Sequence, residues 1–426
     1  MNVRISKSEI RGRVLVPLSK SIAHRLMTCA ALAGGKYVCE GGGQDMVATA
    51  DCLEVMLPHI CKFLSVRENG GNFGEADEVK NNDDLPRLNA HESGSTLRFL
   101  LPIVGAIGFE CVFVGEGRLA QRPIGRLTEV LEKHGCKIEY LGDKQLPLKI
   151  SGRLSAGEYI IDGSVSSQYV TSLLFALPLL DGDSKLVVTN RRVSQSYVDI
   201  TLDVLAQFGI EITKTQYGYD IKGNQHYVVP RAVHGEGDWS SACFMLALGA
   251  LAGEVRASGL NEKSLQGDRE IVTLLRHAGV NIGCEGTDIF ATKSNILPID
   301  FDAEDCPDMV PIMATVLSFA DGVSHIKHVD RLRDKESDRL SAIRTMLADF
   351  GIRTEYGEDT LTVYGGEHKP CTTHGFNDHR MAMSAMVCAL CTEGESIVEG
   401  VECISKSYPT FIEHAVSLGA KIEEIK

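Results

Sequence analysis

Four basic side chains lie at or just after the start of strongly apolar stretches of the sequence: Lys20, Arg25, Arg98 and Arg380. The stretches are typical of buried helices, and the N-terminus of a helix already carries partial positive charge. For any one of the four, a side chain that reaches past the helix to water is the simpler explanation. Together they favour a bound anion, which free backbone N–H groups, the helix dipole and a cation would all stabilise. The sequence therefore predicts a cationic site for a small molecule with several negative charges.

The segment SKSIAHR contains the first of these groups. Ser21 and Arg25 are four residues apart and share one face of the predicted helix, with Lys20 next to them. A serine hydroxyl and the fork of a guanidinium suit a phosphate or a carboxylate. Lys20 could also carry a proton.

The segment KESDR combines two cations with a carboxylate. We expect Lys335 and Arg339 at positions i and i+4 of one amphipathic helix, where like charges are unfavourable unless an anion lies between them. Glu336 beside them is either part of the chemistry or part of a solvated charged face. The apolar stripe of this helix consists of Leu340, Ile343, Leu347 and Phe350.

Two more helix starts carry polar groups. Asp308, in CPDMVP, is either an ordinary carboxylate of a helix N-terminus or a general base held among cations. Ser166, Ser167 and Gln168 supply neutral hydrogen-bond donors. The sequence has no Walker-type phosphate loop, no GxGxxG and no HExxH, so we expect neither a nucleotide cofactor nor a metal site.

The elements that must position these residues recur along the chain. A polar cluster followed by an apolar helix starts at Ser19, Ser93, Ser166, Ser240, Pro307 and Asn377. A second helix ends on a glycine and turns into a strand at Gly135, Gly209, Gly279, Gly351 and Gly419. A sixth, degraded turn is expected in LPHICKFLSV, at Pro58 and His59. Six units of about 71 residues follow.

Two globules of three units each explain these repeats better than a solenoid, because all six helices are equally apolar. We place the joint near His226–Asp238, where a proline and two glycines interrupt the pattern. The segment Val66–Glu92 is rich in Gly, Asn and acidic residues, and we expect an exposed hairpin and loop there.

Composition excludes several classes of protein. The chain has 426 residues and a net charge of −14, without a basic tail, so nucleic acid is not an expected partner. It has no run of 18 apolar residues and no apolar signal segment, which predicts a cytoplasmic protein that does not enter a membrane. Its 13 cysteines are scattered, and Cys388 and Cys391 are expected to be core residues.

Taken together, the motifs resemble the EPSP synthase (3-phosphoshikimate 1-carboxyvinyltransferase) family. They are SKSIAHR, SGSTLR, QRPIG, SSQY, SQSYVD, CPDM, KESDR, NDHRMAM and KSYP, in family order over nearly the whole chain. The resemblance implies transfer of the enolpyruvyl group of phosphoenolpyruvate to the 5-hydroxyl of shikimate 3-phosphate, with release of phosphate. It also implies an α/β fold of two domains, each of three βαβαββ units, with the active site in the interdomain cleft. The domains expected are 1–17 plus 234–426 and 18–233, in a monomer.

The resemblance also implies roles for single residues. Asp308 would accept the proton of the attacking hydroxyl, and Glu336 and Lys20 would move protons at the enolpyruvyl carbons. The residues expected to bind shikimate 3-phosphate are Lys20, Ser21, Arg25, Ser166, Ser167, Gln168, Ser194, Tyr197, Asp308 and Lys335. Those expected to bind phosphoenolpyruvate are Lys20, Gly94, Arg122, Gln168, Arg339, Arg380 and Lys406, where Gly94 lets the ligand approach the backbone.

The sequence departs from the family pattern at Leu18, His24, Glu92 and Arg331. Glu92 places a carboxylate near the expected anion site, which bears on affinity for phosphoenolpyruvate. The nearest rival is the sister transferase that acts on UDP-N-acetylglucosamine, but the loop Gln121–Gly125 lacks the cysteine expected there. A catalytically silent binding protein would not need the intact acid–base residues, and an acidic scaffold protein would not explain the helix-start cations.

Overall fold

The computed structural model describes residues 1–37, 42–69, 82–190, 193–232 and 235–425. The chain forms two compact units. Unit 1 comprises Met1–Lys20, Gly41–Gln44 and Glu236–Lys426, and unit 2 comprises Ser21–Glu40 and Asp45–Gly235.

The described part of unit 2 has two four-stranded sheets, ordered β3-β4-β6-β5 and β7-β8-β10-β9. In each sheet the first two strands are parallel, with a buried helix between them in the chain, and the other two join as an antiparallel hairpin. The elements are α1 (Lys20–Leu32), α2 (Gln44–Glu68), β3 (Arg87–Asn89), α3 (Gly94–Ile107), β4 (Cys111–Val114), η2 (Leu119–Gln121), α4 (Gly125–Lys133), β5 (Cys136–Tyr140), β6 (Leu148–Gly152), β7 (Glu158–Asp162), α5 (Ser167–Ala176), β8 (Ser184–Thr189), α6 (Gln195–Gln207), β9 (Ile212–Thr215) and β10 (Gly218–Ile221).

Unit 1 contains three four-stranded sheets with the same pairing pattern, ordered β2-β11-β13-β12, β14-β15-β17-β16 and β18-β19-β1-β20. Strands β1 and β2, from the N-terminus, complete two of these sheets. The elements are β1 (Asn2–Ser6), β2 (Ile10–Leu15), α7 (Trp239–Ala252), β11 (Gly253–Ser258), η4 (Gly267–Glu270), α8 (Ile271–His277), β12 (Asn281–Glu285), β13 (Asp288–Thr292), β14 (Phe301–Asp302), η5 (Pro307–Met309), α9 (Val310–Ser318), β15 (Val323–Lys327), η6 (Asp330–Asp334), α10 (Arg339–Asp349), β16 (Thr354–Gly357), β17 (Thr360–Tyr364), β18 (Thr372–His374), α11 (His379–Cys391), β19 (Glu395–Glu399), η7 (Val401–Lys406), α12 (Phe411–Ser417) and β20 (Lys421–Ile425).

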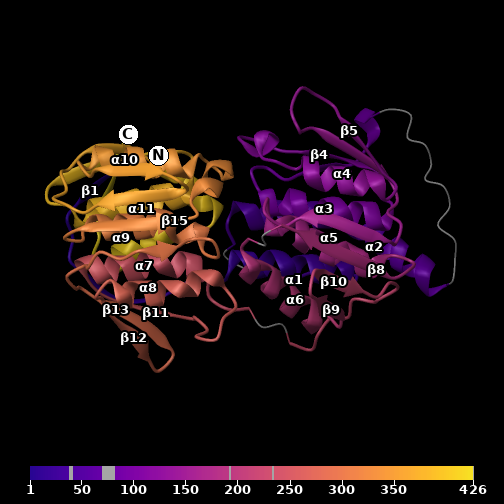
Figure 1. Ribbon diagram of the computed structural model, residues 1–426, viewed down its shortest axis with the longest axis horizontal. Coiled ribbons are helices and arrows are strands. Elements are labelled where there is room, and N and C mark those ends of the chain that lie inside the picture. Colours follow the sequence, from indigo (N-terminus) through magenta and orange to yellow (C-terminus); the bar gives the residue numbers. More distant parts are fainter. Residues whose placement is uncertain (38–41, 70–81, 191–192, 233–234, 426) are drawn as a thin grey trace. The chain divides into compact units, whose positions relative to one another are not determined.

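Each unit is built around its apolar helices. In unit 1, α7, α9 and α11 contact one another in the centre of the unit (Figure 1). In unit 2, α5 packs against both α3 and α6. All of α9 is buried, and α11 is buried up to its last residue, because their small and apolar side chains can bury every face. The polar first turns of these helices are the points at which charged groups can lie beside a buried core.

The structure confirms most of the predicted repeat. The six apolar helices are present as α1, α3, α5, α7, α9 and α11. The five turn glycines all have positive φ, from 77° at Gly209 to 108° at Gly135, and each follows a helix and precedes a strand. Five of the six expected units are thus described as βαβαββ units, each with one four-stranded sheet, the arrangement that the family resemblance implies.

The sixth turn is a wrong prediction. Helix α2 runs through Pro58 without a break, from Gln44 to Glu68. Pro58 lies on an exposed face, so water can satisfy the carbonyl group that loses its helical partner. Within the described residues, the first repeat of unit 2 has helices but no strand.

The segment Val66–Glu92, expected to be an exposed hairpin and loop, is described only at its two ends. Its first residues end helix α2, and Arg87–Asn89 near its other end form β3, which pairs in parallel with β4. The middle of the predicted loop, residues 70–81, lies outside the described residues.

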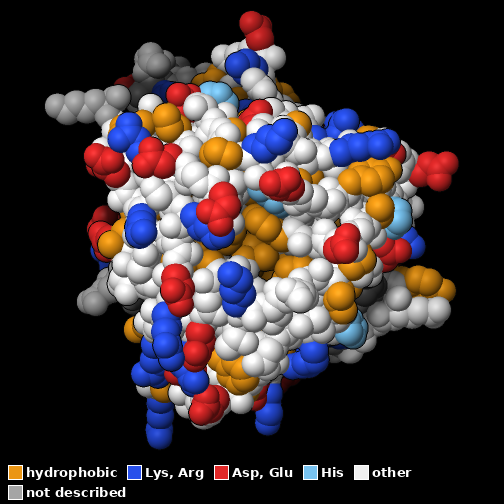
Figure 2. All heavy atoms as spheres, turned by 90° about the vertical axis from the view of Figure 1, so that its left-hand side faces the viewer, with side chains coloured by type: hydrophobic (Ala, Val, Ile, Leu, Met, Phe, Trp, Pro, Cys, Tyr) orange, Lys and Arg blue, Asp and Glu red, His pale blue; other side chains and the backbone are white. Residues whose placement is uncertain are grey.

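Over the face of unit 1 that Figure 2 draws, Lys and Arg side chains are interspersed with Asp and Glu. The net charge is therefore not concentrated in a patch of one sign on this face.

Candidate functional site

Helix starts and the turns before them bring charged side chains together in unit 1. Asp308 lies in η5 immediately before α9, Arg339 begins α10, and Arg380 is the second residue of α11. Lys335 and Glu336 lie in the segment between η6 and α10. Each element therefore contributes its polar end to the same place.

The carboxylate of Asp308 is the common acceptor of three of these cations. Arg339 Nη1 donates to Oδ1 at 2.7 Å, and Lys335 Nζ donates to the same oxygen at 3.3 Å. Arg380 Nη2 donates to Oδ2 at 3.3 Å, and its Nη1 donates to the backbone carbonyl of Asp308. The Asp308 side chain is 17% exposed, so it can still meet a small molecule.

Arg339 is the most enclosed of these cations, at 1% exposure. Its Nε donates to Asp378 Oδ2 at 2.7 Å, and its Nη2 donates to Glu336 Oε2 at 2.6 Å. Burial alone would lower the pKa of Arg339, but the carboxylates of Asp378, Glu336 and Asp308 more than offset it and raise that pKa. Arg339 is therefore a permanent cation that ties three carboxylates together.

Asp378 is the completely buried partner of Arg339. It accepts hydrogen bonds from the backbone N–H of Arg380 and from Ser337 Oγ, both at 3.0 Å, and so caps α11. Burial raises the pKa of this carboxyl, yet the Arg339 guanidinium outweighs it and the net shift is downward. Asp378 thus remains charged and fixes both arginines.

Lys335 and Lys20 complete the cations around Asp308 and Asp238. Burial lowers the pKa of Lys335, and Asp308 opposes that shift. Lys20, the first residue of α1, acts electrostatically on Asp238 and on His379. Both lysines are only half-buried. Each is placed to hold an anion or to transfer a proton.

Lys406 lies at the end of η7, where its Nζ donates to the carbonyl and side-chain oxygens of Asn377, at 2.8 and 3.0 Å. It completes a set that we name the unit 1 charge cluster. The cluster holds five basic and five acidic side chains: Lys20, Lys335, Arg339, Arg380, Lys406, Asp238, Asp268, Asp308, Glu336 and Asp378. Carboxylates thus balance the helix-start cations within this cluster, and the cationic anion site expected from the sequence stays a prediction.

In unit 2, Arg25 is held inside the fold. Its Nε donates to Thr201 Oγ1, its Nη1 to the Ser21 carbonyl and its Nη2 to the Tyr197 carbonyl, at 2.6–2.8 Å. The guanidinium also lies over the Phe99 ring, 5.1 Å from its centre. Burial lowers the pKa of Arg25 to about 10, so it stays charged at neutral pH. Arg25 brings the starts of α1 and α6 together.

The start of α5 is organised by a second arginine. Ser166 caps α5 by accepting from the Gln168 backbone N–H at 3.2 Å. Gln168 in turn accepts from Arg98 Nη1 at 2.6 Å and donates to Ser95 Oγ at 3.0 Å. Arg98 fixes the orientation of the Gln168 amide, and Ser167 follows the cap, buried in the first turn.

Two more predicted residues have special backbone or packing. Ser194 precedes α6 with φ of 51°, a left-handed conformation that costs a non-glycine residue free energy. A Cβ on Gly94 would lie 2.8 Å from Arg122 Nη1. The missing side chain of Gly94 therefore makes room for the Arg122 guanidinium, which is itself buried.

The structure places the predicted residues in two groups. Lys20, Asp308, Lys335, Glu336, Arg339, Arg380 and Lys406 are in unit 1, and Ser21, Arg25, Gly94, Arg122, Ser166, Ser167, Gln168, Ser194 and Tyr197 are in unit 2. One local prediction is wrong: α10 begins at Arg339 after the cap Asp338, so Lys335 is not one helical turn away. The anion between the two cations is Asp308 itself.

Sequence reasoning missed three residues of the cluster. Asp378 stands two residues before Arg380, and its capping position could have marked it. Asp238 caps α7 in the same way and carried the same signal. Asp268 gave no signal, because it lies in the short turn η4 outside both repeated phrases.

The positions that depart from the family pattern have structural partners. His24 is buried, and its Nδ1 lies 2.7 Å from Thr49 Oγ1. Arg331 donates to the Glu304 carbonyl at 3.3 Å. Leu18 is 40% exposed and forms a backbone bridge with Gly237. Within the described residues, none of these three contacts joins the unit 1 charge cluster.

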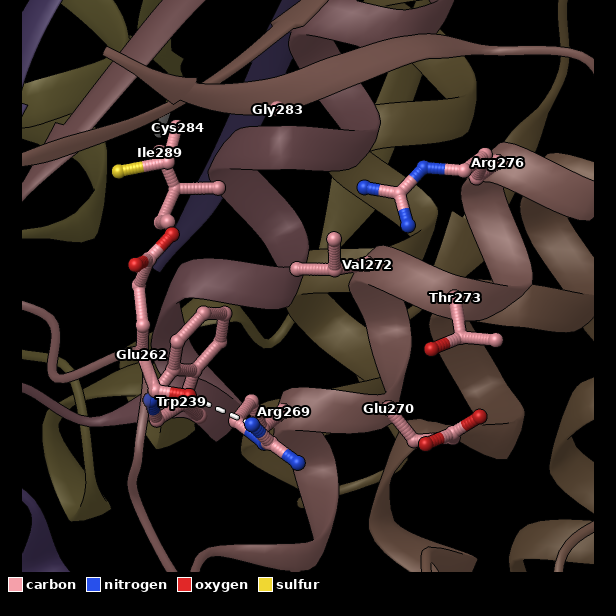
Figure 3. A pocket seen from close by; sticks show the side chains of 10 residues that line it. All are labelled: Trp239, Glu262, Arg269, Glu270, Val272, Thr273, Arg276, Gly283, Cys284 and Ile289. Carbon is pink, nitrogen blue, oxygen red and sulfur yellow. Dashed lines mark hydrogen bonds between the residues drawn. The ribbon is translucent and has the colours of Figure 1, made fainter.

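Figure 3 shows a pocket of about 210 Å³ in unit 1, between η4 and α8 on one side and the β12–β13 hairpin on the other. Arg269 donates to the Glu262 carbonyl at its edge. None of the ten lining residues is a predicted site residue.

Among the helices of the described ranges, none combines the length and the apolar character that a membrane crossing requires.

This chain is similar to known EPSP synthases over nearly its whole length. The family model described as EPSP synthase (3-phosphoshikimate 1-carboxyvinyltransferase) matches residues 5–415. The 3-phosphoshikimate 1-carboxyvinyltransferase of Clostridium kluyveri is 40% identical over 99% of this chain and 98% of that protein, and that of Clostridioides difficile is 36% identical with the same coverage.

Solved structures show the same fold. An EPSP synthase from Acinetobacter baumannii superimposes with a TM-score of 0.75 at 22% identity, over 99% of this chain and 100% of that chain. The enolpyruvyl transferase NikO from Streptomyces tendae gives 0.72 at 19% identity, over 99% and 98%.

Proposed function

This chain belongs to the EPSP synthase family, and from that premise we propose how its own residues transfer the enolpyruvyl group of phosphoenolpyruvate to the 5-hydroxyl of shikimate 3-phosphate. The products are 5-enolpyruvylshikimate 3-phosphate and phosphate. The observation that carries the assignment of roles is the Asp308 carboxylate, which is partly exposed and hydrogen-bonded by Lys335, Arg339 and Arg380.

Asp308 is proposed as the general base for the attacking hydroxyl. Three cations donate to its oxygens in the free protein, two to Oδ1 and one to Oδ2, which leaves this carboxylate little capacity to accept from a hydroxyl. An anionic substrate that draws Arg380 towards itself would release Oδ2 for the hydroxyl proton. Arg339 cannot move in this way, because it is also bound to Asp378 and Glu336. In this proposal Arg339 fixes the base, and movement of Arg380 releases it.

The first half of the reaction forms a tetrahedral intermediate. The 5-hydroxyl oxygen bonds to C2 of phosphoenolpyruvate, its proton passes to Asp308, and C3 takes a proton from Lys20 or Glu336. In the second half, C3 loses a proton to the same pair and the C2–O bond to phosphate breaks. Lys20 and Glu336 are suited to this exchange because one is a half-buried amine and the other a carboxylate held by Arg339.

Phosphoenolpyruvate is proposed to bind Lys20, Gly94, Arg122, Gln168, Arg339, Arg380 and Lys406. Arg380 is the strongest candidate for direct contact, because its hydrogen bonds to Asp308 are long, at 3.3 Å. Arg339 retains little donor capacity for a ligand, since its Nε, Nη1 and Nη2 all donate to carboxylates. Its part is chiefly to fix Asp308 and Glu336.

Shikimate 3-phosphate is proposed to bind Lys20, Ser21, Arg25, Ser166, Ser167, Gln168, Ser194, Tyr197, Asp308 and Lys335. The phosphate would meet hydroxyl and amide donors at the starts of α5 and α6, near the buried charge of Arg25. Neutral donors around one buried cation favour a phosphate ester over a larger polyanion.

The experiment is a phosphate-release assay with both substrates, comparing wild type with Asp308→Asn. The variant keeps the size of the side chain but cannot accept the proton, so we expect turnover to fall by about 100-fold or more. Asp321→Asn, at an exposed position of the same unit, is the matched control and should retain full activity. Absence of turnover in wild type contradicts the function, whereas full turnover in Asp308→Asn contradicts only the role of that residue.

We further propose that the protein acts as a monomer in the cytoplasm. The acidic composition supports this, as do the described cysteines, all of which are free thiols. Light scattering on the purified chain and cell fractionation test the two statements separately.

A further inference from the structure

Asp268 is a buried carboxylate that the reaction as proposed does not use. It lies in η4, is 2% exposed, and accepts a hydrogen bond from Ser240 Oγ through its Oδ2. Its Oδ1 has no hydrogen-bond partner among the described residues. An ionised or half-satisfied carboxyl group in such a position is costly, so a compensating role is expected.

The cation beside Asp268 is Arg380, whose Nη1 lies 4.0 Å from Oδ2. The same guanidinium donates to the Asp308 side chain and backbone. Arg380 is therefore shared between two carboxylates. We propose that Asp268 is a positioning residue that holds the Arg380 guanidinium away from full pairing with Asp308 and so keeps it available for phosphoenolpyruvate.

The turn that carries Asp268 is itself rigidly held. Gln266 Nε2 donates to the Gly237 carbonyl at 2.9 Å, and its Oε1 accepts from Ser19 Oγ at 2.9 Å. Ser240, which donates to Asp268, lies in the first turn of α7. A carboxylate fixed from two directions can set the position of a flexible arginine side chain.

The surroundings of Asp268 also indicate when its charge is present. Burial raises the pKa of Asp268 to about 6, with Arg380 opposing the shift and the charge of Asp308 adding to it. Among the described residues, the other titratable groups that interact with Asp268 are Asp238, which caps α7, Cys243 on α7, and Cys306 before η5. Near neutral pH the group is thus charged, and moderate acid neutralises it.

This inference rests on the proposed function, and simple charge repulsion predicts the opposite result. Removing a negative charge beside an anion site should tighten phosphoenolpyruvate binding if repulsion dominates. If Asp268 positions Arg380, its loss lets the guanidinium pair fully with Asp308, and binding weakens. The direction of the change in KM therefore separates the two explanations.

The test is steady-state kinetics of Asp268→Asn with each substrate varied. We expect the KM for phosphoenolpyruvate to rise about 10–100-fold, with the KM for shikimate 3-phosphate nearly unchanged. Glu270→Gln is the matched control, because Glu270 lies in the same turn but lines the pocket of Figure 3, and it should behave as wild type. An unchanged or lowered KM for phosphoenolpyruvate overturns the proposal, as does an equal rise in both KM values.

Two further measurements guard against a merely structural effect. Ser240→Ala leaves the charge and removes only the hydroxyl that orients Asp268, so it should raise the same KM by a smaller factor, without adding to Asp268→Asn. The ratio of variant to wild-type KM should fall towards one below about pH 6, and taking the ratio cancels ionisation of the substrate phosphate. A ratio independent of pH contradicts the proposal.

Failure of the function and failure of this inference are distinguishable. If wild type shows no turnover, the function is wrong, and calorimetric titration with phosphoenolpyruvate alone still tests Asp268. Weaker binding by Asp268→Asn than by Glu270→Gln then supports positioning, and equal binding overturns it.

Discussion

Replacing Arg339 by methionine should cost unit 1 much of its stability. The side chain is 1% exposed and pairs with Asp378, which is completely buried, at 2.7 Å. Methionine fills the volume but leaves Asp378 as an uncompensated buried charge. Breaking a buried ion pair from one side costs about 3–5 kcal/mol. For a unit of roughly 200 residues, this corresponds to a fall in Tm of about 6–20 °C.

The single tryptophan makes the effect measurable in unit 1 alone. Trp239 is the only tryptophan in the chain and is 1% exposed in that unit, so its fluorescence follows unit 1 unfolding. Arg344→Met is the matched control, because Arg344 lies exposed on the same helix. We expect the control to shift Tm by no more than about 2 °C, since surface substitutions change stability by about 0.5 kcal/mol.

Two results would show that Asp378 does not depend on Arg339 for its counter-charge. The first is an Arg339→Met variant no less stable than Arg344→Met. The second is a double variant, Arg339→Met with Asp378→Asn, whose loss equals the sum of the single losses. The pH dependence has a fixed sign: the lowered pKa of Asp378 gives stability above the unfolded-state value of about 4, which is lost as pH falls below it. The difference from wild type should therefore shrink in acid.

Three further outcomes are expected from the described contacts. Gly94→Ala places a Cβ 2.8 Å from Arg122 Nη1, so the guanidinium must move, and we expect the KM for phosphoenolpyruvate to rise about ten-fold with little change in Tm. Asp268→Asn should raise the Tm of unit 1 at about pH 8, because a buried carboxyl with a pKa of about 6 destabilises the fold when ionised, and this gain should vanish as pH falls to about 4. Burial lowers the pKa of His379 to about 3, so wild-type stability should fall as pH drops below about 6.5 and the unfolded chain takes up a proton; His379→Leu should reduce the slope of Tm against pH there.

The repeated elements were predictable because each carries a local signal. The turns at Gly351 and Gly419, where a helix ends and a strand follows, can be recognised from neighbouring residues alone. The left-handed turn favours glycine, and the spacing of apolar residues changes there from that of a helix to that of a strand. The expected turn at Pro58 shows the limit. Proline usually ends a helix, but an exposed position lets water satisfy the freed carbonyl, and exposure is a property of the fold.

The sequence marked several members of the unit 1 charge cluster, but not how they pair. The types and positions of Asp308, Lys335 and Arg339 marked them, but no local signal shows that both cations donate to one oxygen of Asp308. Those residues come from separate elements that meet only through tertiary packing. Asp268 lies outside both repeated phrases, and its proposed role depends on Arg380, more than one hundred residues away in the chain, so it also escaped prediction.

The balance of charge in the unit 1 charge cluster has a consequence for how an anion binds. Buried cations without counter-charges would destabilise the free protein, so Asp308, Asp268 and Asp378 must be present before any substrate. If a substrate anion binds Arg380 as proposed, it competes with those carboxylates, and its affinity measures the difference in free energy between the two pairings of Arg380. Arg339 is held by Asp378 and Glu336, so a substrate anion would not displace its hydrogen bonds easily. Arg380 donates to Asp308 over a longer distance of 3.3 Å, so it is the cation that an anion would draw away more readily. We propose that the carboxylates thus decide which cations a substrate can recruit, and that release of Asp308, the proposed base, depends on substrate binding.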